Sequence, residues 1–519
     1  MDMELKNTVI GIELGSTRIK AVLMGKDHKV LSQGAFTWEN SFVDGIWTYS
    51  LDEVREGIRK CFSELRKDFE KTYGQKLTTT GAIGISAMMH GYLPFDRDDK
   101  QLVPFRTWRN TMTGEAAEKL TEMFSFNIPQ RWSVAHLYQA FLNGEEHTGR
   151  IAYITTLAGY VHYVLTGRKV VGIGEASGMF PIDPEKPEYN KKMAEIMRRE
   201  TGIDILSYLP EVLVAGEDAG TLTSEGARYL DPTGEFESGI RVVPPEGDAG
   251  TGMVATDSVR EHTGNVSAGT SDFAMVVLDK ELGVHKEVGI VTTPAGKPVA
   301  MVHCTNCTSD INAWIELIRE SMECFGVGVD TNTLYTTLFS KALEGDAESG
   351  DLLSYNYYSG EGVTGFDEGR LLFIRKPDSV FNLANFMKTH FMSSLATLKI
   401  GMDILRNEEN VTVNNINGHG GFFKTPGVGQ RFLSAAIDAN VSVMETAGEG
   451  GPYGMALLCA YALWRDHGET LEDYLDNKVF RDVKRTTLKV SEEEVASFNR
   501  FIEKYKKGLE IERKAIERF

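Results

Sequence analysis

Two copies of one short pattern constrain the fold of this 519-residue chain more than any other feature. In residues 9–24 and again in residues 265–278, two runs of β-prone residues flank a turn of glycine and hydroxylated residues. The two turns are Gly15-Ser16-Thr17 and Gly269-Thr270-Ser271. Glycine lets a backbone approach a ligand closely, and the N–H groups of such a turn suit a phosphate oxygen. The repetition predicts a duplicated domain whose halves bind one polyphosphate between them, which indicates a nucleotide-dependent phosphotransferase.

The composition is that of a packed globular protein with two domains. The chain exceeds the size at which single hydrophobic cores stop growing, and 42% of its residues are hydrophobic. Its formal net charge of −19 argues against binding to nucleic acid or to an anionic membrane, because both require clustered Lys and Arg. A nucleotide ligand stays compatible with that charge, because backbone N–H groups and Mg²⁺ can hold it.

Targeting and cysteine signals predict a cytoplasmic protein. The first residues lack an apolar signal region, and no run reaches the ~18 apolar residues of a membrane span. Five cysteines in so long a chain do not form a disulfide framework. We interpret the lone Cys304-Thr-Asn-Cys307 pair as small residues at a strand end or loop, rather than as a zinc or redox site.

The order of expected elements fits a mixed sheet covered by helices in each half. Three extended runs come first, followed by a helix over 51–71 and a buried strand over 80–87. Further helices are expected around 113–124, 133–142, 155–166 and 189–200, and a domain boundary near 254–262. In the second half we expect strands around 265–278, 299–303 and 411–417, and helices around 310–322, 333–343, 384–406, 428–439 and 449–464. The charged amphipathic segment 491–519 is expected to be a packed surface helix.

Glu13 and Lys20 flank the first turn. Glu13 ends an otherwise apolar strand, where a carboxylate is costly without a partner, and this favours a role in binding Mg²⁺ or its waters. Lys20 lies on the following strand and is either a phosphate-binding cation or a solvated strand residue.

Asp248 is the most informative acid of the chain. Glycines at 247, 250 and 252 leave space around it, and a helix is expected to begin at about the same place. Backbone donors at a helix N-terminus can hold a carboxylate in position. Asp248 is therefore expected to take the proton from a sugar hydroxyl as it attacks the γ-phosphate, the alternative being a helix cap.

Three other stretches are candidates for ligand contacts. The glycine-rich stretch Gly418–Gln430 follows a strand and precedes a helix, so a flat adenine could lie against its backbone. Met89-His90-Gly91 and Trp108-Arg109-Asn110 combine apolar side chains with hydrogen-bonding groups, as a pocket for a small polyol does. Core or rim packing is the alternative for both.

Taken together, these residues resemble an FGGY carbohydrate kinase, a family of the sugar-kinase, Hsp70 and actin fold superfamily. The resemblance covers essentially the whole chain. Five features carry it in order: Glu13–Thr17, Met89–Gly91, Leu165–Gly167 with Ala176–Gly178, Gly247-Asp248 through Ser267–Ser271, and Gly418–Gln430. It implies an α/β fold of two RNase H-like domains, with mixed sheets flanked by helices and an ATP cleft between them. The domains would be 1–256, with the sugar site, first hairpin and base, and 257–519, with the second hairpin and the adenosine site.

The resemblance also implies roles for single residues. Mg²⁺ would bind near Glu13, and Asp248 would be the catalytic base. Adenosine would contact Gly420 and Gly421, with Lys424 in the same nucleotide-binding stretch.

The substrate that the resemblance implies is a ketopentose such as xylulose. Met89-His90 is similar to the xylulokinase branch, whereas glycerol kinases carry an Arg-Glu pair there. Two departures are present: Glu13 replaces the usual Asp, and Trp108-Arg109-Asn110 replaces Trp-Asn-Asp. Ribulose, fuculose, rhamnulose or an erythritol-type polyol therefore stay open as substrates.

Two readings without sugar phosphorylation also stay open. One is an actin- or Hsp70-like ATPase, and the other is a catalytically silent sugar sensor. The expected partners are a small sugar and, in a homodimer, a second copy of the chain.

Overall fold

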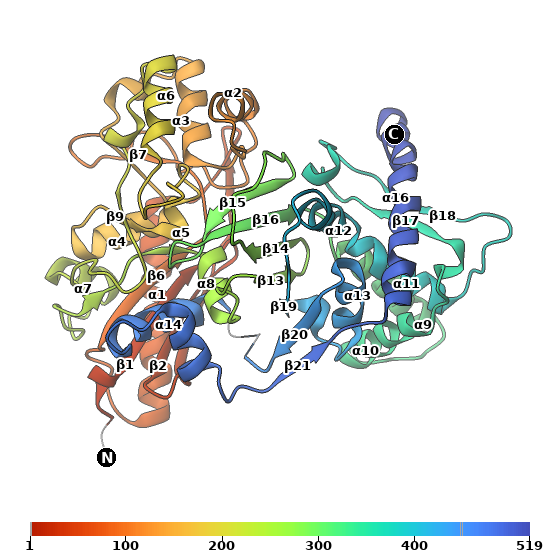
Figure 1. Ribbon diagram of the computed structural model, residues 1–519. Helices are drawn as coiled ribbons and strands as arrows, with labels where there is room; N and C mark the ends of the chain where they lie inside the picture. Colours follow the sequence, from red (N-terminus) through yellow and green to blue (C-terminus); the bar gives the residue numbers. More distant parts are fainter. Residues whose placement is uncertain (1–2, 447, 449) are drawn as a thin grey trace. The chain divides into compact units, whose positions relative to one another are not determined.

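The computed structural model describes residues 3–446, 448 and 450–519, and the chain divides into two compact units (Figure 1). The first unit comprises Met1–Val259, Ile290–Val299 and Glu449–Asp482, and the second Arg260–Gly289, Ala300–Gly448 and Val483–Phe519. The chain first passes from one unit to the other between Val259 and Arg260, inside the region expected for the boundary. Each unit consists of three separate segments of the sequence, however, so the division into domains 1–256 and 257–519 stays a prediction.

A mixed sheet forms the centre of the first unit. Its strand order is β11-β6-β1-β2-β3, and β12 also pairs with β6. The strands are β1 (Thr8–Leu14), β2 (Arg18–Gly25), β3 (Val30–Thr37), β6 (Ala82–Ala87), β11 (Arg241–Val242) and β12 (Glu246–Gly247). Strand β2 is antiparallel to β1 on one side and to β3 on the other. Strand β6 runs parallel to β1, and β11 and β12 run parallel to β6. Parallel strands bring their carboxyl ends to one edge, and in this register Ser86 pairs with both Glu13 and Glu246.

Helix α1 (Leu51–Tyr73) covers this sheet next to β3. Its start is fixed by a capping box, in which the Ser50 side chain accepts from Glu53 N–H and the Glu53 side chain accepts from Ser50 N–H. The buried residues of its inner face recur with helical spacing from Val54 to Phe69. The predicted helix over 51–71 is confirmed.

Shorter elements complete the first unit. The helices are α2 (Gly114–Phe124), α3 (Ser133–Leu142), α4 (Leu157–Thr166), α5 (Ile173–Ala176), α6 (Lys191–Thr201), α7 (Ser224–Leu230), α8 (Asp248–Ala255), α14 (Gly451–Trp464) and α15 (Leu471–Tyr474). The small paired strands are β4 (Ser41–Val43) with β5 (Ile46–Thr48), β7 (Leu93–Phe95) with β8 (Tyr153–Thr155), and β9 (Val170–Gly172) with β10 (Glu211–Leu213).

Helix α14 packs against β1, β6 and α8, although it lies more than 400 residues after β1 in the sequence (Figure 1). Glycines allow this close approach. A Cβ on Gly11 of β1 would lie 2.1 Å from the Pro452 carbonyl oxygen, and a Cβ on Gly454 would lie 1.9 Å from the Thr251 carbonyl oxygen. The helix therefore completes the first unit by backbone contacts that only glycine permits.

Gly11→Ala is expected to lower the free energy of unfolding of the first unit by about 1–3 kcal/mol, because a methyl group would push into the α14 backbone. Calorimetric thermal unfolding measures this. Gly149→Ala is the control, since no atom lies within 4 Å of its Cβ position. Equal unfolding midpoints for the two variants would contradict the close packing of α14.

Most of a seven-stranded sheet with the order β15-β16-β14-β13-β19-β20-β21 belongs to the second unit. The strands are β13 (Thr263–Ala268), β14 (Asp272–Val277), β15 (Val288–Thr292), β16 (Pro298–Cys304), β19 (Asn415–His419), β20 (Asn440–Met444) and β21 (Arg485–Leu488). As in the first unit, an antiparallel hairpin, β13–β14, is followed by a parallel neighbour, β19. A separate hairpin is formed by β17 (Leu353–Asn356) and β18 (Leu371–Ile374).

The helices of the second unit are α9 (Ser309–Cys324), α10 (Thr331–Lys341), α11 (Leu383–Ser394), α12 (Ala396–Asp403), α13 (Val428–Ile437) and α16 (Glu492–Arg518). The amphipathic C-terminal helix is confirmed as α16, with a capping box at Ser491 and Glu494. The single helix predicted over 384–406 is wrong, because Leu395 separates α11 from α12 with a φ of −109° and a ψ of 3°. The strand predicted over 411–417 begins four residues later, at Asn415.

Candidate active site

The first glycine-rich turn is held by two aromatic side chains. Gly15 N–H donates to the Arg18 carbonyl oxygen across the turn at 2.9 Å. Trp38 Nε1 donates to the Gly15 carbonyl oxygen at 2.7 Å, and the Tyr49 hydroxyl donates to the Ser16 carbonyl oxygen at 2.5 Å. The Trp38 and Tyr49 rings stack with centroids 4.2 Å apart. The carbonyl groups of the turn are therefore fixed, while the Thr17 side chain stays exposed.

Trp108 belongs to the same surroundings, because its Nε1 donates to Ser16 Oγ at 3.3 Å. Arg109 is exposed and places its guanidinium over the Trp47 ring, 4.0 Å from the ring centroid. Asn110 is buried and holds the Trp47 backbone through two hydrogen bonds of 2.9 Å. The three residues of this motif thus have different roles: Trp108 contacts the turn, Arg109 stacks on an aromatic ring, and Asn110 fixes the chain.

Glu13, Lys20 and Asp248 lie close together in the first unit. Glu13 and Lys20 are paired across β1 and β2. The pKa of Glu13 is raised to about 7. Burial is the largest cause, the Asp248 charge acts in the same direction, and Lys20 opposes both. Asp248 is the first residue of α8, and its Oδ1 accepts from Met89 N–H at 3.1 Å. Burial raises the pKa of Asp248 to about 6, and the Met89 hydrogen bond partly offsets this.

Met89 and His90 follow β6, and each is only 5% exposed. Met89 reaches Asp248 through its backbone. His90 has a φ of 73°, a rare conformation for a residue with a side chain, and its Nδ1 lies 3.4 Å from the Gly178 carbonyl oxygen. A Cβ on Gly178 would lie 2.5 Å from that nitrogen, so the Ala176–Gly178 segment packs directly behind His90.

Two further acids near Asp248 are missing from the sequence-based prediction. Glu246 is 1% exposed and accepts from Gly174 N–H at 3.3 Å and from Glu175 N–H at 2.9 Å. Glu175 is fully buried, and neither of its carboxylate oxygens has a hydrogen-bond partner. The sequence signal was weak: each acid is next to glycine or alanine in a segment already singled out for another residue.

The residues around Glu13 fit a magnesium ion that is shared with phosphate. No group of three or more His, Cys, Asp or Glu side chains among the described residues is arranged to hold a metal by itself. Mg²⁺ is commonly held by one or two carboxylates together with substrate phosphates and water, and Glu13 could supply such a carboxylate. Space for Glu13 depends on Gly451, because a Cβ there would lie 1.9 Å from Glu13 Oε1.

The second glycine-rich turn is held by the loop that contains the CxxC pair. Gly269 N–H donates to the Ser271 carbonyl oxygen at 2.9 Å. Cys307 N–H donates to Thr270 and Thr308 N–H donates to Gly269, both at 2.9 Å. Cys304 is the last residue of β16 and Cys307 lies in the loop after it, as expected, and both are buried cysteines without a disulfide bond.

The stretch Gly420–Lys424 lies at the same edge of the second sheet as this turn, because β13 and β19 are parallel neighbours and end there. Gly420 has a φ of 100°, and a Cβ on it would lie 2.4 Å from the Ala268 carbonyl oxygen. Gly421 and Lys424 are exposed. The residues predicted to bind the nucleotide thus form one group in each unit.

Gly420→Ala is expected to raise KM for ATP by at least about tenfold, because the strained backbone costs about 1–3 kcal/mol and displaces the loop. Steady-state kinetics with varied ATP measure this. Gly421→Ala is the control for stability, since no atom lies within 4 Å of its Cβ position. An unchanged KM for ATP in a folded Gly420→Ala protein would remove this loop from the nucleotide site.

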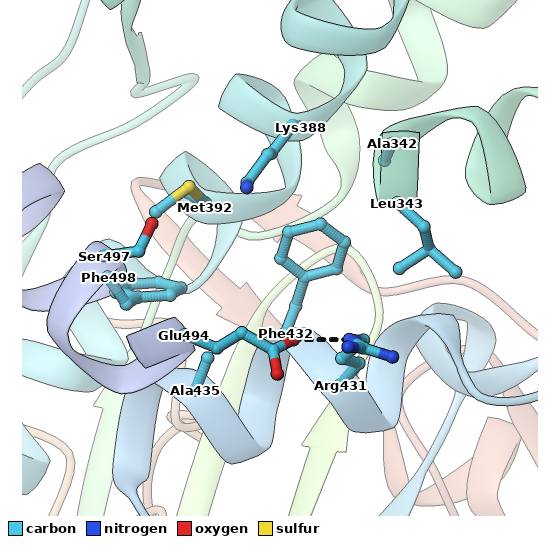
Figure 2. Close-up of a pocket in the computed structure, with 10 residues that line it drawn as sticks. All are labelled: Ala342, Leu343, Lys388, Met392, Arg431, Phe432, Ala435, Glu494, Ser497 and Phe498. Carbon is cyan, nitrogen blue, oxygen red and sulfur yellow. Dashed lines mark hydrogen bonds and ion pairs between the residues drawn. The ribbon is translucent and has the colours of Figure 1, made fainter. Parts of the chain in front are cut away.

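A cavity in the second unit is not part of this group. It has a volume of about 60 Å³ and lies among α11, α13 and α16 (Figure 2). The Arg431–Glu494 ion pair closes one side, and Lys388 and Met392 of α11 line another. This volume corresponds to about two water molecules, so a sugar or nucleotide does not fit.

Among the described residues, no helix combines the length and the apolar character needed to cross a bilayer.

Comparisons with known proteins identify the family of this chain. The models of the FGGY family of carbohydrate kinases match residues 8–249 for the N-terminal domain and 264–463 for the C-terminal domain. A xylulose kinase of Haemophilus influenzae is 23% identical over 422 residues, which are 76% of this chain and 79% of that protein.

Solved structures share the fold. A ligand-bound xylulose kinase from Lactobacillus acidophilus aligns with a TM-score of 0.79 and 14% identity over 98% of both chains. A gluconate kinase from the same organism aligns with a TM-score of 0.79 and 14% identity, over 96% of this chain and 97% of that chain. The predicted α/β fold of two domains with mixed sheets flanked by helices is confirmed. The chain belongs to the FGGY family of carbohydrate kinases, and is therefore a sugar-phosphorylating phosphotransferase.

Proposed function

We propose that this kinase transfers the γ-phosphate of ATP to a hydroxyl of a ketopentose such as xylulose, with Asp248 as the catalytic base. The observation that carries the proposal is the hydrogen bond of 3.1 Å from Met89 N–H to Asp248 Oδ1, beside Glu13 and Lys20. It fixes a carboxylate at the N-terminus of α8, where it is ionised at neutral pH because its pKa is about 6.

Asp248 accepts the proton of the attacking hydroxyl, so that a better nucleophile meets the phosphorus atom. Lys20 and the N–H groups of Ser16 and Thr17 stabilise negative charge on phosphate oxygens. The second turn, Gly269–Ser271, has the same role.

Glu13 is the residue that we propose for holding Mg²⁺, which neutralises charge on the transferred phosphate. Gly420, Gly421 and Lys424 contact the adenosine. Their exposure and their common edge with the second turn support this assignment.

The sugar is held next to Asp248 by Met89 and His90, with Trp108 at the turn and Arg109 at the rim. A ketopentose is supported by the Met89-His90 pair and by the xylulose kinases among the related proteins. Arg109 in place of Asn leaves ribulose, fuculose, rhamnulose and erythritol-type polyols as alternative substrates of the same chemistry.

The test is ADP release with Mg-ATP and a panel of ketoses, aldonic acids and polyols. The proposal expects kcat/KM to be highest for a ketopentose, at least about tenfold above the other classes. ATP hydrolysis that no sugar stimulates would favour an actin- or Hsp70-like ATPase. Sugar binding by calorimetry without any phosphorylated product would indicate a silent sensor.

A further inference from the structure

Glu175 is a buried acid for which the proposed mechanism has no use. It lies in α5, a turn of four residues, and it is 0% exposed. Neither carboxylate oxygen has a hydrogen-bond partner of standard geometry, and only a weaker interaction with the Thr156 side chain stabilises the carboxylate, whereas buried polar groups are nearly always well paired. Such a group is costly in a stable fold, so its position needs an explanation.

The side chain of Glu175 is directed at the peptide that carries Asp248. A Cβ on Gly247 would lie 2.4 Å from Glu175 Oε2, and 2.9 Å from Met89 Cγ. Gly247 is the N-cap residue of α8, so Glu175 and Met89 both pack against the α-carbon that directly precedes Asp248. Met89 also donates its N–H to Asp248 Oδ1. Glu175 thus touches the support of the proposed base, not the base itself.

The turn that carries Glu175 is itself fixed by Glu246. The Glu246 carboxylate accepts the N–H groups of Gly174 and Glu175. Gly172 and Gly174 leave room for this carboxylate, since a Cβ on either would lie within 2.4 Å of one of its oxygens. The α5 turn therefore packs against three consecutive residues, Glu246, Gly247 and Asp248.

The surroundings of Glu175 disfavour a charge on it. Burial raises its pKa well above the ordinary value, and the Glu246 and Asp248 carboxylates raise it as well, while the Thr156 side chain lowers it. Tyr189 is a further titratable group near it, and its pKa is also raised by burial. An ionised Glu175 would repel the charge that Asp248 needs in order to act as a base.

We propose that Glu175 is a positioning residue for Asp248, which packs against the Gly247–Asp248 peptide as an uncharged carboxylic acid and so fixes where the base points. This inference rests on the proposed role of Asp248 in sugar phosphorylation. Asp248 is then the acid of this group that carries the negative charge during the reaction.

The kinetic test compares Glu175→Ala with Glu175→Gln. Loss of the side chain in Glu175→Ala leaves the Asp248 peptide unsupported, so kcat is expected to fall at least about tenfold while KM for ATP changes less than about twofold. The neutral amide of Glu175→Gln replaces a neutral acid and is expected to restore kcat to at least about a third of the wild-type value. Wild-type kcat in Glu175→Ala, or equal losses in both variants, would overturn the proposal.

Gly247→Ala tests the same contact without removing a buried group. Its methyl group would press on Glu175, so kcat is expected to fall, and the fall should be smaller in the Glu175→Ala background. Gly250→Ala, in the same helix, is the control, because the nearest atom to its Cβ position is 3.3 Å away. Additive losses in the double variant would contradict the coupling.

Infrared difference spectra of the wild type and Glu175→Gln at pH 7 report the charge of Glu175 without any need for activity. The spectrum of the wild type minus that of Glu175→Gln is expected to contain a band of a protonated carboxylic acid, because the other protonated acids are present in both proteins. If it is absent while a sugar is phosphorylated, the inference fails and the kinase function stands. If it is present while no sugar is phosphorylated, the proposed function fails instead.

Discussion

Asp248→Asn is expected to lower kcat for sugar phosphorylation about 10³-fold, which is within the range for loss of a general base. The amide keeps the shape of the side chain and can stay near Met89 N–H, but it cannot accept the hydroxyl proton. KM for ATP is expected to change by less than about threefold, because no nucleotide contact is lost. Steady-state kinetics with varied sugar and varied ATP measure both values.

The pH dependence of kcat/KM tests whether Asp248 acts as a base. A base must be ionised, so wild-type kcat/KM for the sugar is expected to fall as the pH is lowered through about 6, the pKa of Asp248. At saturating Mg²⁺, where a bound cation would keep Glu13 ionised, the residual activity of Asp248→Asn should lack this acidic limb. Asp98→Asn, which removes an exposed carboxylate of the same unit, is the control and should keep the limb. An Asp248→Asn enzyme with nearly normal kcat would remove Asp248 from the mechanism.

Glu13→Gln is expected to lower kcat about 10²–10³-fold, because it removes a charge that would hold a cation against the phosphate. The concentration of Mg²⁺ for half-maximal activity is expected to rise about 10–100-fold. Titration of activity with Mg²⁺ at saturating ATP and sugar measures this value.

Glu13→Asp is the matched variant for Glu13→Gln. It keeps the carboxylate and shortens the side chain by one methylene, toward the residue that the family usually has at this position. Activity is expected to stay within about tenfold of the wild type, because the charge is retained. If Glu13→Gln kept the Mg²⁺ dependence of the wild type, another group would have to hold the metal.

The parts of the fold and site that could be predicted from sequence are local in the chain. Each glycine-rich turn lies between two runs of β-prone residues that are close in sequence, and its glycine and hydroxylated residues are adjacent. Asp248 could be found because the glycines around it and the start of α8 are in one segment. Helix α1 could be found because its apolar residues recur with helical spacing.

The parts that could not be predicted depend on contacts between distant segments. Trp38 and Tyr49 bind the first turn across the fold, and neither belongs to a recognisable pattern. Glu175 and Glu246 meet only because β12 pairs with β6 and the α5 turn packs beside it. The segment Glu449–Asp482 belongs to the first unit through the packing of α14 on β1, which depends on the small size of Gly11. The break at Leu395 lies in a stretch that is buried on both sides, so helical spacing alone does not reveal it.

The most direct measurement is phosphorus NMR of a reaction that contains the enzyme, Mg-ATP and D-xylulose. The account predicts one sugar monophosphate for each ADP formed by the wild type, and formation of both products about 10³-fold slower with Asp248→Asn. ADP that accumulates with inorganic phosphate and without any sugar phosphate, for xylulose and every other sugar tested, would contradict it.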